Sequence, residues 1–387
     1  MKQYLFILGR TPKLALVELN SFVSSSILVR SDIFIATTDR DPRILMQTLG
    51  GTIKVSEVVY TGVAPPTAED IDRILSKEVK DNKLVFGIST YGETHVFTTK
   101  ALFAFKEELV GRGIHSRFIQ SKHHAPLSSV VISKQKISEL VVAEGKDAWY
   151  MGITKSVQDF EQWNERDFGR PFSDPKNGML PPKVARMIVN IAKNTLTKTM
   201  GIVETPILLD PFCGTGTILV EALTMGWQTI GADLSQVAVE RTRKNLSWAR
   251  ARFALKPEVI NVFHSDATHI SDAVKSPVHA IVTEPYMGNT NASDFGRVIE
   301  REKAKNNIKG LEKLYIGCLR EWSKILVRGG VIVMALPQYS LGKETLFVKK
   351  VIDRCENLGY TLLGGPIEYG RPDAVVRREF FVFKKKS

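Results

Sequence analysis

The C-terminal half of the sequence predicts an α/β fold: a Rossmann-like domain with a mostly parallel sheet and helices on both faces. The first observation is that short apolar runs alternate with helical stretches between residues 207 and 337. The second is that three of these runs lead into an aspartate, namely Asp210, Asp233 and Asp266. Because ligands bind outside the carboxyl ends of parallel strands, these acids indicate a ligand site at that edge.

The elements follow one another in a regular order. The predicted strands are ILLD (207–210), TIGAD (229–233), VINVFHSD (259–266), HAIVTEP (279–285) and VIVMALP (331–337). The predicted helices are TILVEALTMG, SQVAVERTRKNLSWAR and LEKLYIGCLREWSKILVRGG. The last two strand-like segments, TLLGGPIEYG and EFFVFKK, are joined by a polar stretch. We expect them to form an antiparallel pair that completes a seven-stranded sheet.

The N-terminal half has a different pattern. Strands such as QYLFILG and KLVFGIST alternate with helices such as PKLALVELNSFV, which is typical of small α+β units. The chain length predicts two or three domains. The expected division is a first α+β domain at 1–60, a second at 61–155, a proline-containing linker at 156–180 and the α/β domain at 181–387.

Composition narrows the classes of protein. A net charge of +12 predicts attraction to polyanions such as nucleic acid. No segment approaches 18 uninterrupted apolar residues, so no membrane span is expected. The N-terminus lacks a small-residue cleavage site, which argues against a signal peptide. The three cysteines have no metal-ligand spacing, so we expect reduced thiols, no metal and a cytoplasmic protein.

The loop DPFCGTG (210–216) joins a strand to a helix, where glycines let a ligand approach the backbone. A dinucleotide site would want a third small residue at the position of Leu219, which counts against NAD. Asp210 would repel a pyrophosphate but suits S-adenosylmethionine, whose methionine end carries an ammonium and a sulfonium. Asp233 is suited to ribose hydroxyls and Asp266 to an adenine amine. The alternative is that Asp210 caps a helix and the other two are turn acids.

The candidate cofactor site contains further residues. Its full membership is Leu180, Pro181, Asp210, Phe212, Gly214, Gly216, Asp233, Leu234, Asp266 and Ala267. Phe212 and Ala267 are expected to supply apolar contact. Leu180 and Pro181 are expected to cover the cofactor, with capping and core packing as the alternative.

TEPY (283–286) follows the fourth strand, where enzymes that methylate exocyclic amines have Asp/Asn/Ser-Pro-Pro-Tyr. Pro285 rigidly places the carbonyl before it, and the ring of Tyr286 is able to stack on a base. Thr283 stands at the position of the acid, and Glu284 comes one residue later. The acceptor of the amine's hydrogen bond is therefore the Thr283 hydroxyl, the Glu284 carboxylate or the backbone carbonyl. Asn289 and Asn291 are candidate partners nearby.

Together, these motifs resemble the THUMP-containing tRNA guanine-N2-methyltransferases that act on guanosine 10. YLFILGRTPKLALVELNSF, SSVVISKQKISELVV, the linker from Val157, DPFCGTGTILVEAL, GADL and TEPYMG occur in the family's order. The resemblance implies a ferredoxin-like domain, a THUMP domain that grips the tRNA acceptor stem, and a class I methyltransferase domain using S-adenosylmethionine. We expect a monomer, with a small activating subunit as an option. The departure from the family lies at Thr283 and Glu284.

Basic residues are the candidates for RNA contact. The chosen set is Arg112, Arg117, Lys122, Lys134, Arg166 and Arg170. The last two lie in the linker, where they would contact either RNA or the methyltransferase domain. Two other functions stay open at this point: an N6-adenine methyltransferase on RNA or DNA, and a catalytically inactive or partner-dependent tRNA-binding homologue.

Overall fold

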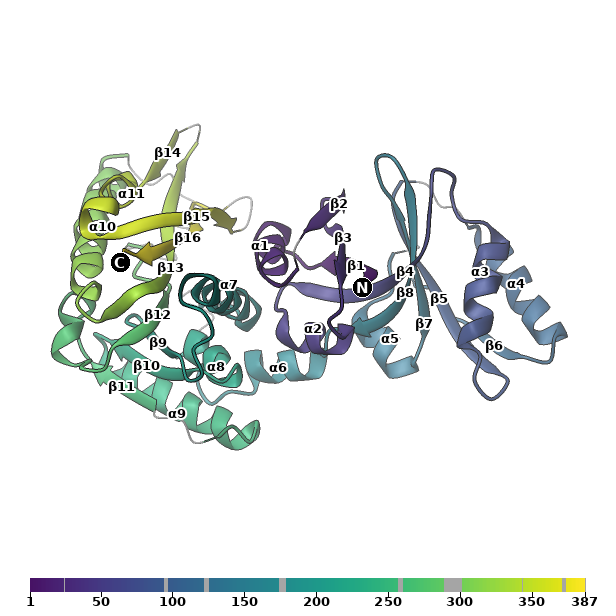
Figure 1. Cartoon of the computed structure of the whole chain (residues 1–387), viewed down its shortest axis with the longest axis horizontal. Helices are drawn as coiled ribbons and strands as arrows, with labels where there is room; N and C mark the ends of the chain where they lie inside the picture. Colours follow the sequence, from purple (N-terminus) through teal and green to yellow (C-terminus); the bar gives the residue numbers. More distant parts are fainter. Residues whose placement is uncertain are drawn as a thin grey trace. The chain divides into compact units, whose positions relative to one another are not determined.

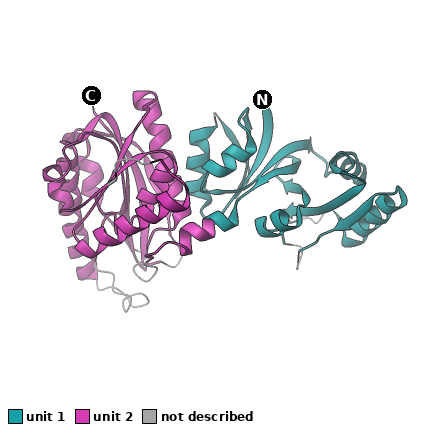
Figure 2. Ribbon diagram, turned by 90° about the horizontal axis from the view of Figure 1, so that it is seen from below, with its two compact units in different colours: residues 1–162 teal, residues 163–387 magenta. Residues whose placement is uncertain are grey.

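A computed structural model of the chain describes residues 1–386 apart from 24, 94–96, 122–124, 174–178, 257–259, 289–300, 343 and 371–373. The chain forms two compact units, Met1–Gln162 and Trp163–Ser387, coloured teal and magenta in Figure 2. No helix among the described residues is long and apolar enough to cross a membrane.

The first unit contains one mixed sheet with the strand order β2-β3-β1-β4-β8-β7-β5-β6. The strands are β1 (Lys2–Leu8), β2 (Ser26–Arg30), β3 (Ile33–Thr38), β4 (Thr52–Gly62), β5 (Lys83–Tyr91), β6 (His115–Phe118), β7 (Ser138–Glu144) and β8 (Trp149–Val157). The helices are α1 (Pro12–Phe22), α2 (Pro42–Thr48), α3 (Ala68–Leu75), α4 (Thr99–Gly111) and α5 (Ser129–Gln135), and α6 (Phe160–Phe168) leads into the second unit.

The expected domain boundary at residue 60 falls inside β4, so it does not separate two sheets. β4 pairs with β1 on one side and with β8 on the other, which joins the two expected α+β domains into one sheet. A buried polar cluster lies at this junction. Lys54 on β4 forms an ion pair with Glu139 on β7, with 2.5 Å between Nζ and Oε1, and both side chains are at most 1% exposed. Ser89 and Thr154 also donate hydrogen bonds to the Glu139 carboxylate.

The second unit confirms the predicted fold class. Its sheet has the order β11-β10-β9-β12-β13-β16-β15, with β14 paired to β13. The strands are β9 (Ile207–Asp210), β10 (Gln228–Asp233), β11 (Ile260–His264), β12 (Val278–Thr283), β13 (Leu326–Leu341), β14 (Glu344–Phe347), β15 (Tyr360–Tyr369) and β16 (Val376–Lys385). β9 to β13 are parallel to one another, and β15 and β16 form the expected antiparallel pair.

Helices cover both faces of this sheet (Figure 1). They are α7 (Pro182–Met200), α8 (Thr217–Thr224), α9 (Gln236–Arg252), α10 (Arg301–Trp322) and α11 (Lys349–Arg354). The helix expected at 311–330 ends earlier, at Trp322. The segment from Leu326 joins β13 instead, because Leu326 pairs with Val278 of β12.

The strand order reverses direction at β9 and β12. The chain runs from β9 outward to β10 and β11, and from β12 outward to β13 on the other side. The loops after β9 and β12 therefore diverge, which creates the crevice where ligands bind in doubly wound sheets. Asp210 ends β9 and Thr283 ends β12, so the topology places both at this crevice.

Candidate active site at the carboxyl edge of the sheet

The loop between β9 and α8 adopts a conformation that requires glycine. Gly214 and Gly216 have φ values of +53° and +82°, in the left-handed region. A Cβ added at Gly214 would meet no atom within 4 Å, so the space above this residue is open to a ligand. A Cβ at Gly216 would lie 2.9 Å from Cγ2 of Thr242. Gly216 thus serves close packing, while Gly214 leaves room for a ligand against the backbone.

Two side chains of α9 hold this loop, and neither was predicted from the sequence. Thr242 donates a hydrogen bond to the carbonyl of Gly214 (2.8 Å), and Asn245 donates to that of Thr215 (2.8 Å). Asn245 also pairs with the backbone of Phe172, at 2.9 and 3.0 Å. Asn245 therefore ties the segment before α7 to the glycine loop. The sequence feature that could have identified Thr242 and Asn245 is their position as polar residues on the buried face of a helix.

Asp233 is oriented by backbone amides. Its Oδ2 accepts from the amide of Gly214 and its Oδ1 from the amide of Ser235, both at 2.9 Å. Carboxylate oxygens have further acceptor capacity, so Asp233 remains able to bind hydroxyls. Leu234 beside it is 71% exposed, which leaves an apolar side chain free to contact a ligand.

Asp266 caps a 3-10 turn, whereas the alternative made it a turn acid and gave the capping role to Asp210. Its Oδ1 accepts from the amide and the hydroxyl of Thr268, each at 2.8 Å, at the start of the 3-10 turn Ala267–Asp272. These hydrogen bonds lower the pKa of Asp266. Ala267 is 4% exposed and belongs to the core, where its carbonyl accepts from Trp322 Nε1 (3.1 Å). The expected side-chain contact of Ala267 with a cofactor is therefore corrected to a packing role.

Asp210 is the buried acid of the site. It is 1% exposed, and its Oδ1 accepts from the hydroxyl of Thr283 (2.7 Å) and the amide of Phe212 (3.2 Å). Burial raises the pKa of Asp210 to about 7, and the nearby charges of Asp233 and Glu284 add to the effect. It does not cap α8, whose N-cap is Gly216. A carboxylate held in this environment is stabilised by a cationic ligand, and the ammonium of S-adenosylmethionine fits that requirement.

The side chains of the TEPY segment have different partners and different exposure. Thr283 is fully buried and directs its hydroxyl to Asp210, so its expected role as the amine acceptor is corrected. Glu284 forms an ion pair with Arg378 of β16 and keeps 17% of its side chain exposed. Burial raises the pKa of Glu284, and Arg378 opposes this rise. Pro285 is buried, whereas the ring of Tyr286 is 54% exposed.

Two buried tyrosines hold the loop after β12. Tyr315 of α10 donates a hydrogen bond to the carbonyl of Tyr286, and Tyr339 of β13 donates to that of Met287, both at 2.6 Å. Gly288 has a φ of +98°, and a Cβ there would clash with the hydroxyl of Tyr339. The backbone that carries Glu284, Pro285 and Tyr286 is thus fixed from two elements. Asn289 and Asn291 lie outside the described residues.

Leu180 and Pro181 precede α7. Leu180 is 3% exposed, and the carbonyl of Pro181 accepts from the amides of Val184 and Ala185 at the start of the helix. The packing and capping alternative therefore holds for both residues. Phe212 is half-buried and lies edge-on to Trp322, with 6.5 Å between ring centroids.

The two linker arginines expected to contact RNA are buried in the second unit, which corrects that expectation. Arg166 pairs with Glu221 of α8 (3.1 Å) and stacks on Trp163. Arg170 donates to the hydroxyl of Thr217 (2.7 Å) and is 5% exposed. Both side chains therefore attach residues 163–170 to α8, the helix that follows the glycine loop.

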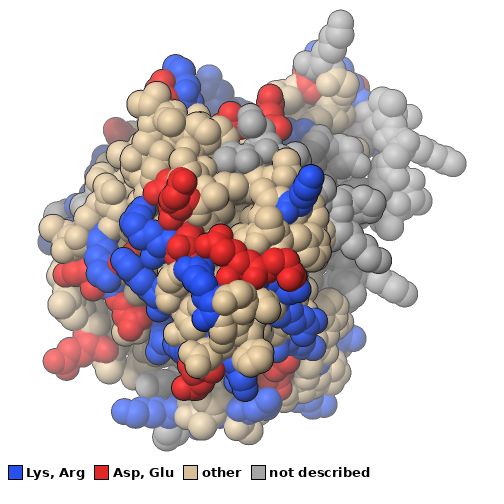
Figure 3. All heavy atoms as spheres, turned by 90° about the vertical axis from the view of Figure 1, so that its right-hand side faces the viewer, with Lys and Arg blue, Asp and Glu red and all other residues tan. Residues whose placement is uncertain are grey.

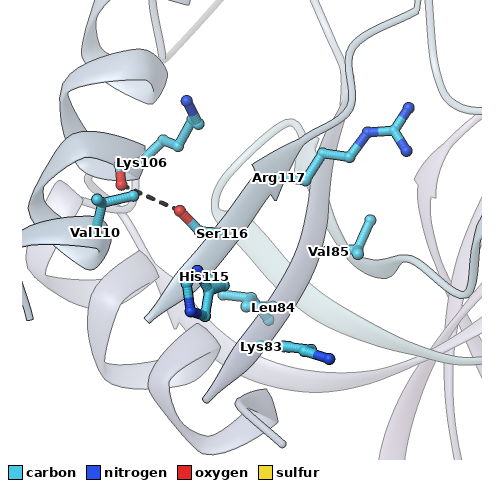
Figure 4. Close-up of a pocket in the computed structure, with 8 residues that line it drawn as sticks. All are labelled: Lys83, Leu84, Val85, Lys106, Val110, His115, Ser116 and Arg117. Carbon is cyan, nitrogen blue, oxygen red and sulfur yellow. Dashed lines mark hydrogen bonds between the residues drawn. The ribbon is translucent and has the colours of Figure 1, made fainter. Parts of the chain in front are cut away.

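The other basic candidates belong to the first unit. Arg117 lines a shallow hollow of about 330 Å³ with Lys83, Lys106 and His115, on β5, α4 and β6 (Figure 4). Arg112 forms an ion pair with Asp72 (2.5 Å). Lys134 lies over the ring of Phe160, 5.4 Å from its centroid. Lys122 is outside the described residues.

Positive charge is concentrated in the second unit. Residues 1–162 contain 20 Lys and Arg against 18 Asp and Glu, a net +2, so residues 163–387 carry +10 of the total +12. Figure 3 shows the end of the molecule that bears α3, α4 and β6, where basic and acidic side chains are interspersed. Contacts of the first unit with a polyanion must therefore depend on particular residues such as Arg117 rather than on bulk charge.

Comparison with known proteins is consistent with this site. Residues 170–356 match the family described as RMKL-like, methyltransferase domain. The tRNA (guanine(10)-N2)-dimethyltransferase of Methanothermobacter thermautotrophicus is 37% identical over 180 residues, which is 46% of this chain and 44% of that protein. The protein of the same name from Pyrococcus abyssi is 27% identical over 284 residues, 72% of this chain and 69% of that protein. The chain thus matches less than half the length of the first relative.

One solved structure extends the likeness in fold to the whole chain. TrmN from Thermus thermophilus has a TM-score of 0.54 and 18% identity, covering 99% of this chain and 99% of that one. At this identity the likeness concerns the fold.

Proposed function

We propose that this chain, whose residues 170–356 match the RMKL-like methyltransferase family, transfers a methyl group from S-adenosylmethionine to the N2 amine of a guanosine in tRNA. We take position 10 as the target, the position named for both archaeal relatives. The observation that carries the proposal is the contact of Asp210 with Thr283 across the crevice. It places the buried acid of the cofactor loop directly beside the TEPY segment.

The cofactor would be held by the chain's own acids and glycine loop. When bound, S-adenosylmethionine supplies a methyl group on a positively charged sulfur. Asp210 would pair with its ammonium, Asp233 with the ribose hydroxyls, and Asp266 with the adenine amine. The open backbone at Gly214 and the exposed side chain of Leu234 would complete the site. Thr242 and Asn245 would keep the loop in place before the ligand arrives.

Glu284 is the group we assign as the amine acceptor. With Thr283 committed to Asp210, the Glu284 carboxylate is the charged acceptor of this segment with part of its surface accessible. A carboxylate that accepts a hydrogen bond from the N2 amine stabilises the positive charge that develops on nitrogen during attack. The same carboxylate would take the proton that the amine loses. The exposed ring of Tyr286 would stack on the target base, which must leave its helix to reach the site.

Residues 61–155 would act as a THUMP domain that binds the acceptor stem of tRNA. Arg112, Arg117, Lys122 and Lys134 are the proposed phosphate contacts, with Arg117 beside Lys83 and Lys106 as the strongest group. The first domain would comprise residues 1–60 within the shared sheet, and the chain would act as a monomer. Sedimentation velocity of the protein alone and with tRNA tests the oligomeric state.

Replacing Arg117 with glutamate is expected to weaken tRNA binding by about threefold to tenfold. The slope of the logarithm of the binding constant against the logarithm of the salt concentration should also become shallower, by the amount that corresponds to about one phosphate contact. Filter binding at several salt concentrations measures both quantities. Arg73→Glu is the matched control, because Arg73 is an exposed arginine of the same unit whose side chain pairs with Asp70. Equal losses for the two variants would mean that the effect comes from net charge and not from a contact at Arg117.

Replacing Tyr339 with phenylalanine is expected to lower kcat by about fivefold to tenfold, because the carbonyl of Met287 loses the hydrogen bond that fixes the TEPYMG loop. Affinity for S-adenosylmethionine, measured by calorimetry, should stay unchanged. Tyr360→Phe is the control, since Tyr360 is equally buried and donates to the carbonyl of Leu319, away from the loop. A similar fall in kcat for the control would assign the effect to packing.

The direct test of function is the nucleoside product. Unmodified tRNA is incubated with the protein and S-adenosylmethionine, digested to nucleosides and analysed by mass spectrometry. We expect N2-methylguanosine, with N2,N2-dimethylguanosine at longer times, and no product from Asp210→Asn. N6-methyladenosine would instead identify an adenine methyltransferase. Cofactor and tRNA binding without any methylated product would identify a catalytically inactive homologue or one that needs a partner.

A further inference from the structure

The partner of Glu284 comes from a distant part of the chain. Arg378 lies near the start of β16, where it is opposite Pro337 of β13, and its Nε donates to Oε1 of Glu284. The two side chains are 24% and 17% exposed, so the pair is accessible to a ligand and not sealed in the core. Arg378 also lies over the ring of Tyr369, 5.8 Å from its centroid. A negative acceptor and a positive donor are thus fixed side by side at the target-base crevice.

The orientation of Glu284 is supported by its electrostatic effects. Its charge contributes to the raised pKa values of Asp210 and Tyr315, which lie at the end of β9 and on α10. Tyr315 in turn holds the carbonyl of Tyr286. The charge of Glu284 therefore acts on both the cofactor loop and the loop that carries Tyr286.

Guanine and adenine differ in the hydrogen-bond donors and acceptors that they would present to the Glu284–Arg378 pair. Guanine presents two donors, the N2 amine and N1–H, next to an acceptor, O6. Adenine presents one donor, the N6 amine, next to an acceptor, N1. An ionised carboxylate only accepts hydrogen bonds, and a guanidinium only donates them. A carboxylate beside a guanidinium therefore matches guanine at all three positions, whereas adenine N1 would face a repelling oxygen.

We propose that Glu284 and Arg378 together determine specificity for guanine: the Glu284 carboxylate accepts from N1–H and the N2 amine, and the Arg378 guanidinium donates to O6. This inference rests on the proposed methyl transfer to guanosine and adds a residue, Arg378, that lies outside the TEPY segment. Oε1 is able to accept a second hydrogen bond while it holds Arg378, because a carboxylate oxygen has two lone pairs. Arg378 favours the ionised, purely accepting form of Glu284 and opposes the burial that raises the pKa of this carboxyl group.

The pair has a further chemical consequence. A glutamine or asparagine at position 284 would offer one acceptor and one donor, which is the complement of adenine's edge. Discrimination by a site that hydrogen-bonds its substrate is large, because the wrong partner leaves buried polar groups unpaired. Guanine selectivity at this site would thus depend on charge at position 284 and on its neighbour at 378.

The test uses the full chain, S-adenosylmethionine and tRNA transcripts that carry either guanosine or 6-thioguanosine at the nucleotide the wild type methylates. Sulfur accepts hydrogen bonds poorly, so the second transcript weakens the contact with O6 alone. The variants are Glu284→Gln and Arg378→Leu. Arg377→Leu is the matched control, because it removes the same charge from the adjacent residue, whose partner is Glu368. Cofactor affinity by calorimetry and thermal unfolding confirm that each variant is folded and binds S-adenosylmethionine.

For the wild type we expect kcat/KM to fall about tenfold on the 6-thioguanosine transcript. Arg378→Leu should lose about 10- to 100-fold on guanosine and should no longer distinguish the two transcripts. Glu284→Gln should lose at least about 100-fold, and Arg377→Leu should behave as the wild type. The inference would be overturned if Arg378→Leu lost the same factor relative to the wild type on both transcripts and so still distinguished them, or if Glu284→Gln kept full activity. In either case, formation of N2-methylguanosine by the wild type would still uphold the proposed function. N6-methyladenosine as the wild-type product, or no product at all, would overturn both.

Discussion

Replacing Asp210 with asparagine is expected to weaken binding of S-adenosylmethionine by about 10- to 100-fold and to abolish methyl transfer. The reason is that a buried carboxylate facing an ammonium forms a charge-assisted hydrogen bond, which the neutral amide replaces only in part. Isothermal titration calorimetry measures the affinity. Asp272→Asn is the matched control, because Asp272 is an exposed acid in the neighbouring 3-10 turn. Unchanged affinity in Asp210→Asn would remove Asp210 from the cofactor site.

Binding of S-adenosylmethionine by the wild type is expected to depend on pH through Asp210. Burial raises the pKa of Asp210 to about 7, so below that pH the folded protein without cofactor holds a proton on this carboxyl group. Binding of the ammonium requires the ionised form, and the wild-type affinity should fall as the pH decreases from 8 to 6, with uptake of one proton on release of the cofactor. Asp210→Asn should lack this dependence. Calorimetry in buffers of different ionisation enthalpy detects the proton.

Stability should respond in the opposite sense. A carboxyl group whose pKa is higher in the folded than in the unfolded state contributes stability that is present below the unfolded value and is lost as the pH rises through about 7. Above that pH, wild-type Asp210 is a buried charge, and Asp210→Asn should unfold at a higher temperature than the wild type. A lower unfolding temperature at pH 8 would contradict this account of the site.

Replacing Glu139 with alanine is expected to destabilise the first unit by about 3–5 kcal/mol. Glu139 accepts from Lys54, Ser89 and Thr154, and its removal leaves a buried ammonium and two hydroxyls without their acceptor. Urea unfolding followed by circular dichroism measures the change. Glu57→Ala is the control: Glu57 pairs with Lys2 at the surface, where the ion pair is worth at most about 1 kcal/mol.

A loss below about 1 kcal/mol for Glu139→Ala would show that water or a neighbouring group replaces the carboxylate. The double variant Lys54→Met with Glu139→Leu separates the cost of the unpaired buried charge from the loss of the other contacts of Glu139. If the cost comes from the unpaired charge, the double variant should recover most of the lost stability, since both buried charges are then absent.

The strands and the acids of the cofactor site were predictable from local sequence. The runs of three to seven residues that precede Asp210, Asp233 and Asp266 correspond in the structure to β9, β10 and β11. Asp210 and Asp233 end their strands, and Asp266 follows β11 by two residues. Gly214 was equally predictable, because a tight turn with an open approach requires glycine. These features depend on neighbours in the sequence, and periodicity and turn chemistry are local properties.

The division of the first unit was not predictable in this way. A boundary near residue 60 suited the pattern of short strands, yet β4 pairs with β8, about 95 residues further along the chain. Arg166 and Arg170 stood in a charged linker where they were expected to contact either RNA or the methyltransferase domain, and they pair with Glu221 and Thr217 of α8. The exposure of these two arginines depends on how segments that are distant in the sequence pack together.

The sequence by itself therefore determined the class of fold, the glycine loop, the strand-end acids and the place of TEPYMG. The tertiary structure alone decided which partners the side chains of that segment have. Thr283 is turned to Asp210 from the neighbouring strand, and Glu284 meets Arg378 from a strand that follows 94 residues later. Both contacts arise from strand order and register, which depend on the summed packing of the whole sheet and leave no periodic signal in the chain.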